Sequence, residues 1–449
     1  MSRRAELSSE EFQELFGKNE CDSNTSETDE EIIEKQEGPH FISTFQGTMM
    51  LARFCVGSGL FSIPAAFKYS GIMGGIIWVF INGFLTAYGM RKLTKLSSEI
   101  TRRSGSISVY YGDLGEECAK EISSENGGKV GRVVVNIAIV ISCFCLVCTQ
   151  FIYIAAIWQQ GFEKIGIPQM NISSWILVVY CVLFPLFQIR RPDTLATCSL
   201  LANVLTVVGT VTVFVHIFSA RTFQTYRQEN KVFWTKLPLT IGITSYAYQL
   251  MAPLIVTMRS SMKEPSKVHF VINIVLACVT VLYAVMGAAG YASCHPDCAD
   301  SILLNLPGSR YASIVKIFLG LASCIGTVLG MFVCFNVVEP ILGHYFPESC
   351  MLFTSTTTRI FFLTFAAGIT AAVPELTNVM SLAGSFTNPV FGFIFPAFGH
   401  IALFRRTLSR VDLAKDIALL FCGLFILFIG FYTSLYMIVL DLEYPSYPS

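Results

Sequence analysis

The stretch GTMMLARFCVGSGLFSIPAAFK, from Gly47 to Lys68, decides the fold. It is apolar enough to enter a membrane, but Gly57 and Gly59 lack the Cβ atoms that shield a helix backbone, and Pro64 lacks an amide donor. We therefore expect a membrane helix that unwinds at mid-membrane. Free N–H and C=O groups at that depth are tolerated only where they line a cavity, because lipid cannot satisfy them. A glycine-rich helix crossing is the alternative explanation for this motif alone.

The rest of the chain has the composition of a membrane protein. Of its 449 residues, 53% are apolar and 14% are charged, and the mean hydropathy is +0.58. Apolar segments of about 20 residues or more match a hydrocarbon core roughly 30 Å thick. Eleven such segments run approximately from 43 to 67, 71 to 90, 131 to 158, 172 to 189, 195 to 218, 237 to 258, 268 to 291, 312 to 346, 355 to 373, 378 to 404 and 416 to 440. The sequence predicts an all-α polytopic membrane protein with one transmembrane domain, residues 41–440.

The charges predict the orientation of the chain. Residues 1–40 carry twelve acidic and four basic side chains and are expected to form a disordered cytoplasmic tail. Basic residues gather in the connections on that same side, as at Arg91 and Lys92, which places the N-terminus in the cytoplasm. The connection after the fifth segment is the one exception. With an odd number of helices, the short tail 441–449 is expected on the opposite side. The net charge is zero and there is no basic block, so a nucleic-acid partner is excluded.

A second segment repeats the break of the first. It reads GITSYAYQ at residues 242–249 and is followed by Pro253. The two broken segments open the first and second groups of five helices. Paired discontinuous helices at corresponding positions are typical of inverted-repeat transporters, which hold their substrate at the free helix ends. Free amides suit a carboxylate and free carbonyls suit an ammonium, so a zwitterion fits both.

These breaks predict the residues of the substrate site. No buried acid or base near them is obviously free to pair with a charged side chain, which favours small neutral substrates such as glycine, alanine or GABA. Each polar side chain can instead be a hydrogen bonder in helix packing. The expected substrate-binding residues are Gly57, Ser58, Gly59, Leu60, Thr244, Ser245, Tyr246 and Tyr248.

Beyond these features, the chain resembles the amino acid/auxin permease family. The resemblance covers residues 41 to about 440. It implies eleven helices, a five-plus-five inverted-repeat fold, and amino acid transport coupled to protons or, in some branches, to sodium. Leu306-Pro307-Gly308 is similar to the vesicular inhibitory amino acid transporter branch, and Gly57-Ser58-Gly59 to the proton-coupled branch. The motifs that carry the resemblance are Gly57-Ser58-Gly59-Leu60, Ile63 to Lys68, Tyr246, Pro253, Met262 to Lys267, Leu304 to Pro307, Val338-Glu339-Pro340 and Pro374-Glu375 to Pro396.

A charge inside the first segment predicts a coupling mechanism. Arg53 lies about 15 Å into this helix, where an unpaired charge costs several kcal/mol. Glu339, about 10 Å from the same end of the eighth segment, is the expected partner. Protonation of Glu339 would release Arg53 and open an inner gate, which would couple transport to protons. The alternative is that Arg53 snorkels to lipid head groups and Glu339 faces the cytoplasm.

Three further sites lie in the connections. Asn171-Ile172-Ser173 is an N-glycosylation acceptor on the expected outer side. Cys294 and Cys298 lie in an outer loop where an oxidising compartment permits a disulfide. A metal site there is disfavoured because two thiols and one histidine lack a fourth ligand. No cofactor is expected.

Other functions remain as alternatives. An enzyme is disfavoured because the six histidines are scattered instead of facing one cavity. A transporter-like sensor that binds an amino acid and signals without much flux stays open. The acidic tail and the vesicular resemblance favour an intracellular vesicle or a lysosome-like membrane, with the plasma membrane as the alternative.

Overall fold

The computed structural model describes residues 43–104, 110–123, 125–168, 170–190, 192–219, 232–249, 251–373 and 375–443. The predicted tail 1–40 and the last residues, 444–449, lie outside them. The helices are α3 (Thr44–Cys55), α4 (Ser58–Ser104), α5 (Tyr111–Lys120), α6 (Glu125–Glu163), α7 (Ile172–Leu186), α8 (Pro192–Ser219), α9 (Leu237–Tyr246), α10 (Met251–Ser261), α11 (Val268–Cys294), α12 (Arg310–Tyr345), α13 (Glu348–Ala372), α14 (Leu376–Asn388), α15 (Phe395–Phe404) and α16 (Arg410–Glu443). A 3₁₀ turn, η2 (Pro265–Lys267), precedes α11, and a π-helical turn, η3 (Pro389–Ile394), joins α14 to α15.

The predicted membrane segments correspond to these helices. Among the described residues, nine helices are long and apolar enough to cross a membrane, and α7 is a shorter apolar helix. Helix α4 holds the end of the first predicted segment and all of the second, since Gly71, at φ 68°, turns the chain between them. Several helices extend past the apolar segments, and α16 ends at Glu443 instead of residue 440. The fold is an all-α polytopic membrane protein, as predicted.

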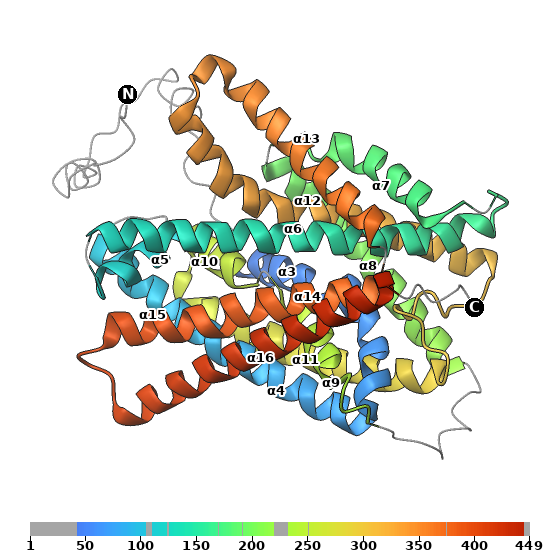
Figure 1. Cartoon of the computed structure of the whole chain (residues 1–449), viewed down its shortest axis with the longest axis horizontal. Helices are drawn as coiled ribbons and strands as arrows, with labels where there is room; N and C mark the ends of the chain where they lie inside the picture. The colour runs from blue at the N-terminus through green and yellow to red at the C-terminus, as the bar shows by residue number, and fades with distance from the viewer. Residues whose placement is uncertain are drawn as a thin grey trace, which may run out of the picture. The chain divides into compact units, whose positions relative to one another are not determined.

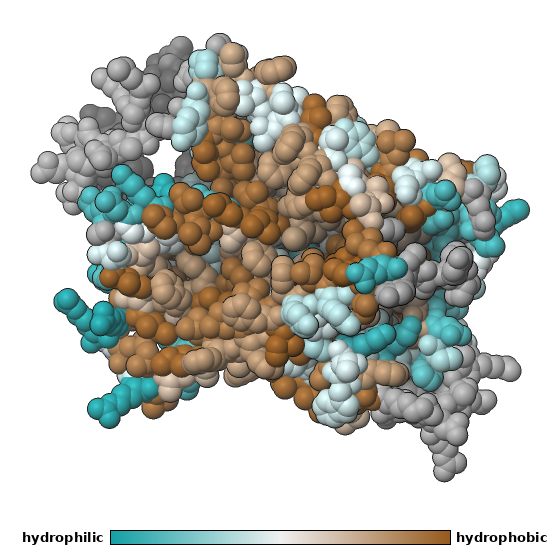
Figure 2. Space-filling view, in the orientation of Figure 1, coloured by the Kyte–Doolittle hydropathy of each residue, from teal (hydrophilic) through white to brown (hydrophobic). Residues whose placement is uncertain are grey.

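The helices pack in two groups. Helices α3, α4, α9, α10 and α11 contact one another, and α6, α7, α12 and α13 form the second group. Figure 1 shows α6 crossing the view, with α7, α12 and α13 on one side of it and α4, α11, α15 and α16 on the other. Apolar side chains cover the middle of this face, and hydrophilic ones gather toward its two ends (Figure 2). This band matches the hydrocarbon region of a bilayer.

Helix α5, in the connection between the second and third segments, was not predicted. It packs along the start of α6, where a Cβ atom on Gly131 would lie 2.5 Å from the carbonyl oxygen of Gly115. Arg132 of α6 binds Asp113 at 2.8 Å and Glu116 at 2.6 Å. The pKa of Glu116 is lowered because Lys120 donates a hydrogen bond to its carboxylate and Arg132 lies beside it. These ion pairs hold α5 against α6.

A buried ionic cluster joins α4, α15 and α16. The carboxylate of Asp416 is fully buried, 3.2 Å from Lys92 Nζ and 2.6 Å from His400 Nδ1. The hydroxyl of Tyr88 also donates to it at 3.4 Å. A buried carboxylate is tolerated only when paired and hydrogen-bonded in this way.

Asp416→Ala is expected to destabilise the protein by about 3–5 kcal/mol, since it leaves Lys92 buried without a counter-charge. The matched control is Glu264→Ala, whose ion pair with Lys267 is exposed and contributes little. Thermal unfolding of the purified protein measures both variants. Equal unfolding temperatures for Asp416→Ala and the wild type would contradict the structural role of this cluster.

Candidate functional site

The first predicted break separates α3 from α4. Helix α3 ends at Cys55, Val56 is extended at φ −93° and ψ 93°, and α4 begins at Ser58. The first N–H groups of α4 have no acceptor within the helix, because their carbonyl partners would lie in the preceding turn. The unwinding expected from the sequence is confirmed at this position.

The second break separates α9 from α10. Helix α9 ends at Tyr246 and α10 begins at Met251. Between them, Tyr248 N–H donates to Ser245 at 3.1 Å and Gln249 N–H donates to Tyr246 at 3.1 Å. This tight turn interrupts the helix just before Pro253, as predicted.

The two breaks touch each other at Gly59. A Cβ atom added there would lie 2.8 Å from the Cα atom of Ala247, which is closer than such atoms approach. At Gly57, by contrast, an added Cβ would meet no atom within 4 Å. An added side chain would therefore be crowded at Gly59 but not at Gly57. Gly57 faces open space.

Tyr283 of α11 ties the two breaks together. Its buried hydroxyl lies 2.5 Å from the carbonyl oxygen of Cys55 and 2.8 Å from that of Ala247. A phenol has one hydrogen, so the two carbonyls share a single donor. The ends of α3 and α9 are therefore held by one side chain from a third helix.

A cavity of about 60 Å³ lies at the breaks. Four of the eight predicted substrate residues line it, and Leu60 is fully buried elsewhere. The cavity is lined by Arg53, Phe54, Cys55, Gly57, Ser58, Gly59, Leu146, Gln150, Tyr246, Ala247, Gln249, Ser323, Gly326 and Leu329.

Besides Leu60, three of the predicted substrate residues do not line the cavity. Thr244 accepts a hydrogen bond from Trp78 at 2.9 Å, and the Ser245 hydroxyl lies 3.4 Å from the Asn82 amide. The Tyr248 hydroxyl lies 2.9 Å from that of Thr280. These side chains join α9 and its turn to α4 and α11. In this structure these three side chains serve helix packing, which was the alternative interpretation of them.

Sequence reasoning missed other cavity residues, notably Gln150. Its Nε2 atom donates to the Ser58 hydroxyl at 2.9 Å, and Ser58 in turn lies 3.4 Å from the Tyr246 hydroxyl. The sequence signal that could have identified Gln150 is an amide in the middle of an apolar membrane segment, since such a group is costly there unless it serves a site.

The expected ion pair between Arg53 and Glu339 is not formed. Arg53 is buried, and it donates to the Thr206 hydroxyl and the Ala322 carbonyl, both at 2.6 Å. Glu339 instead lies 2.7 Å from Nη2 of Arg359 on α13. The prediction was wrong because it considered depth along the helices but not the neighbours that α8, α12 and α13 supply.

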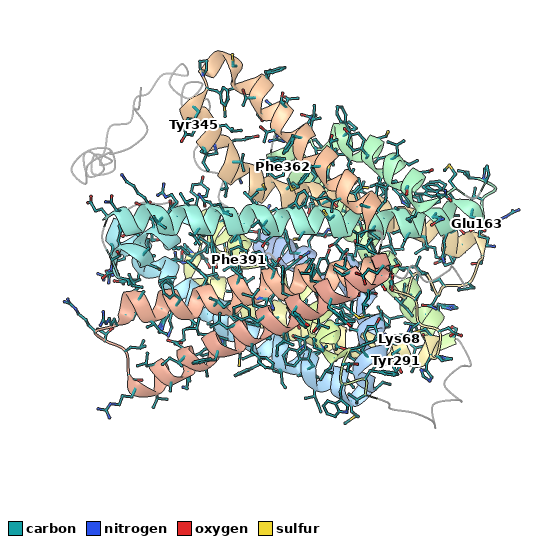
Figure 3. The ribbon with its side chains drawn as sticks, viewed as in Figure 1. Lys68, Glu163, Tyr291, Tyr345, Phe362 and Phe391 are labelled. Atoms are coloured by element: carbon teal, nitrogen blue, oxygen red, sulfur yellow. A yellow bond between two sulfur atoms is a disulfide. The ribbon has the colours of Figure 1, made fainter. Side chains whose placement is uncertain are left out.

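A larger opening of about 750 Å³ lies next to the cavity. Phe54 and Leu329 line both spaces. The larger opening, called here the vestibule, is also lined by Asp113 and Arg132 near α5 and by Glu339 near the end of α12. Figure 3 shows Tyr345, at this end of α12, far from Lys68 and Tyr291 at the other end of the bundle.

The connection between α11 and α12 packs against the beginning of α4. Ile302 N–H donates to the Phe61 carbonyl at 2.8 Å, and Leu303 is fully buried. Nearby, the pKa of Glu375 is raised by partial burial and by the charges of Asp300 and Asp441.

The remaining predicted sites lie in the connections. Cys294 and Cys298 are joined as a disulfide, with Cα atoms 4.9 Å apart. Asn171 is exposed and directly precedes α7, and its glycosylation stays a prediction. Over the described ranges, no group of three or more His, Cys, Asp or Glu side chains is arranged to hold a metal ion.

The comparisons with known proteins agree on a family of amino acid transporters. A family model described as transmembrane amino acid transporter protein matches residues 40–438. Amino acid transporter ANT1 from Arabidopsis thaliana is 25% identical, covering 85% of this chain and 89% of its own. The proton-coupled amino acid transporter-like protein pathetic from Drosophila melanogaster is 24% identical, covering 80% of this chain and 77% of its own.

Solved transporters share the fold. MhsT, in complex with L-phenylalanine, has a TM-score of 0.56 at 13% identity and covers 86% of this chain and 98% of its own. Mhp1, a nucleobase-cation-symport-1 family transporter, has a TM-score of 0.55 at 11% identity and covers 90% of this chain and 93% of its own. These similarities support a five-plus-five inverted-repeat architecture.

Proposed function

The chain belongs to the family of transmembrane amino acid transporter proteins, and from this premise we propose that it carries small neutral amino acids across a membrane by alternating access. The observation that carries the proposal is the contact of two broken helices beside a small cavity. A cavity of about 60 Å³ suits glycine, alanine or GABA better than a large side chain. The space facing Gly57 leaves room for a methyl group.

The conformation described here corresponds to one state of the transport cycle. Two observations support this: the vestibule shares the lining residues Phe54 and Leu329 with the cavity, and Ile302 and Leu303 are buried, with Ile302 bonded to Phe61 of α4. The basic residues of the connections support a vestibule on the cytoplasmic side, and we propose that this state faces inward. Epitope tags at the two termini, probed after selective permeabilisation, test that assignment. Both tags on one side would contradict it.

Counterflow in liposomes tests the function itself. Purified protein is reconstituted with unlabelled glycine, alanine or GABA inside, and the entry of the same labelled compound is followed. Transport predicts transient accumulation of label above its equilibrium level. Binding of the amino acid without accumulation would favour the sensor alternative.

The acidic tail supports an intracellular vesicle or lysosome-like membrane as the location. Staining of the protein together with organelle markers tests this location.

We further propose that protons drive transport and that Glu339 couples them to it. Glu339 lines the vestibule, and its Oε1 atom accepts hydrogen bonds from Nε and Nη2 of Arg359 at 3.0 and 2.7 Å. Protonation removes the charge that holds Arg359 and so frees α12 from α13. A proton-coupled relative supports this choice of ion.

Glu339→Gln is expected to make uptake independent of an imposed pH gradient, since the variant resembles the protonated state at every pH. The measurement is uptake of labelled substrate at several outside pH values in proteoliposomes. Glu264→Gln, an exposed carboxylate between α10 and α11, serves as control and should keep the wild-type profile. A wild-type pH profile in Glu339→Gln would show that another group couples protons to transport.

A further inference from the structure

The cavity contains an unpaired positive charge. Arg53 is the one charged side chain among the described residues that line it. Within the described ranges, its guanidinium donates only to uncharged oxygens, those of Thr206, Ala322 and Val56. Its buried Nε–H has no hydrogen-bond partner among the described residues. A buried arginine without a carboxylate is costly, so a ligand with negative charge would stabilise it.

Arg359 shows how such an edge binds a carboxylate. Its Nε and Nη2 atoms both donate to Glu339, the side-on arrangement that a guanidinium offers to an acid. In Arg53, Nη2 of the corresponding edge donates to the Ala322 carbonyl, and the buried Nε has no hydrogen-bond partner among the described residues. The two arginines differ in that Arg359 has a carboxylate partner in the protein, whereas Arg53 has none among the described residues.

The cavity also contains unpaired hydrogen-bond acceptors. The Oε1 atoms of Gln150 and Gln249 are buried and have no hydrogen-bond partner within the described part of the chain. Both residues line the cavity with Arg53. Nε2 of Gln150 donates to Ser58, which orients the amide and leaves its oxygen as the unpaired atom. An unsatisfied buried acceptor costs about 1–3 kcal/mol, and an ammonium group supplies the donors that both oxygens need.

We infer that these three side chains recognise the two ends of the substrate: Arg53 binds its carboxylate, and Gln150 and Gln249 accept hydrogen bonds from its ammonium. The inference rests on the proposed amino acid transport and specifies the substrate as a zwitterion with a free carboxylate and an uncharged side chain. The carboxylate meets a full charge, whereas the ammonium meets neutral oxygens. Loss of the carboxylate should therefore weaken binding more than loss of the ammonium.

Competition on the unmodified protein tests this order. Labelled alanine uptake into proteoliposomes is competed with unlabelled alanine, with propionate, which lacks the ammonium, and with alaninamide, which lacks the carboxylate. If glycine or GABA shows the stronger counterflow, its own amide and deaminated acid are used. We expect the amide to be the weakest competitor, at least about tenfold weaker than the deaminated acid. An amide that competes better than the acid would overturn the inference while leaving transport established. Absence of counterflow with all three amino acids would instead overturn the proposed function, and the inference with it.

Variants of the glutamines separate recognition from a structural role. Gln150→Leu should raise KM by about tenfold or more, because it removes an acceptor that has no partner within the described part of the chain. It also removes one donated hydrogen bond, as the control below does. Gln159→Leu, on the same helix, is the control, since Gln159 donates to the Met170 carbonyl at 2.9 Å and does not line the cavity. It should leave KM unchanged. Equal KM values for Gln150→Leu and the wild type would exclude Gln150 from recognition.

Arginine variants test the carboxylate contact in the same assay. Arg53→Lys keeps the charge and should retain measurable uptake, whereas Arg53→Gln should lose the preference for alanine over alaninamide. If Arg53→Gln still prefers alanine over its amide by the wild-type factor, Arg53 does not bind the carboxylate.

Discussion

Gly59→Val is expected to abolish uptake while the protein remains folded and inserted in the membrane. A Cβ atom at this position would lie 2.8 Å from Cα and 3.1 Å from Cβ of Ala247. Because the nearest of these atoms belongs to backbone, it cannot move aside as a flexible side chain can. Valine adds two more methyl groups and must separate the breaks. The proposed substrate site is built from both breaks, so their separation would remove it.

Gly57→Ala is the matched control. It adds the same Cβ two residues earlier, where no atom lies within 4 Å. This variant should insert normally and keep uptake of glycine, with weaker uptake of larger substrates because the methyl group enters the cavity. Size-exclusion profiles verify the folding of both proteins, and counterflow measures their transport. Wild-type uptake by Gly59→Val would show that the contact between the breaks is dispensable.

Both breaks could be predicted because their causes are local. Gly57, Gly59 and Pro64 alter the backbone at their own positions, and so does Pro253. The membrane segments could be predicted for a similar reason, since hydropathy sums over neighbouring residues. Helix α5 was missed because its apolar face is short and interrupted by the acids that pair with Arg132.

The partners of buried polar groups could not be predicted in the same way. The depth of Arg53 in the membrane correctly indicated that it needs partners, but depth does not tell which way a helix is rotated. Thr206 and Ala322 are brought to Arg53 by the packing of α3 against α8 and α12. The same limit applies to Thr244 and Tyr248, which lie in the predicted segment but face α4 and α11.

Tyr283 illustrates the limit most clearly. It lies in an apolar segment with no glycine or proline beside it, so the sequence offers no reason to single it out. Its importance comes from three elements that meet only in the fold, namely the end of α3, the end of α9 and the middle of α11.

Tyr283→Phe is expected to lower the uptake rate at least about tenfold with little change in shape. The variant keeps the ring, which packs edge-on against the ring of Tyr248 with the two centroids 5.1 Å apart. It removes the one donor shared by the Cys55 and Ala247 carbonyls. Each buried carbonyl left without a donor costs about 1–3 kcal/mol, and about 1.4 kcal/mol corresponds to a tenfold change in rate.

The control for Tyr283→Phe is Tyr248→Phe, which removes the hydroxyl of the neighbouring ring. That hydroxyl lies 2.9 Å from Thr280, whose own hydroxyl can rotate toward another acceptor, so the loss should be smaller. Initial uptake rates over a range of substrate concentrations distinguish the variants. If the Tyr283 hydroxyl holds the two breaks in the geometry that the substrate needs, Tyr283→Phe lowers uptake far more than Tyr248→Phe. Equal effects of the two substitutions would mean that the shared hydrogen bond contributes only packing stability, and that the contact at Gly59 is sufficient to hold the breaks together.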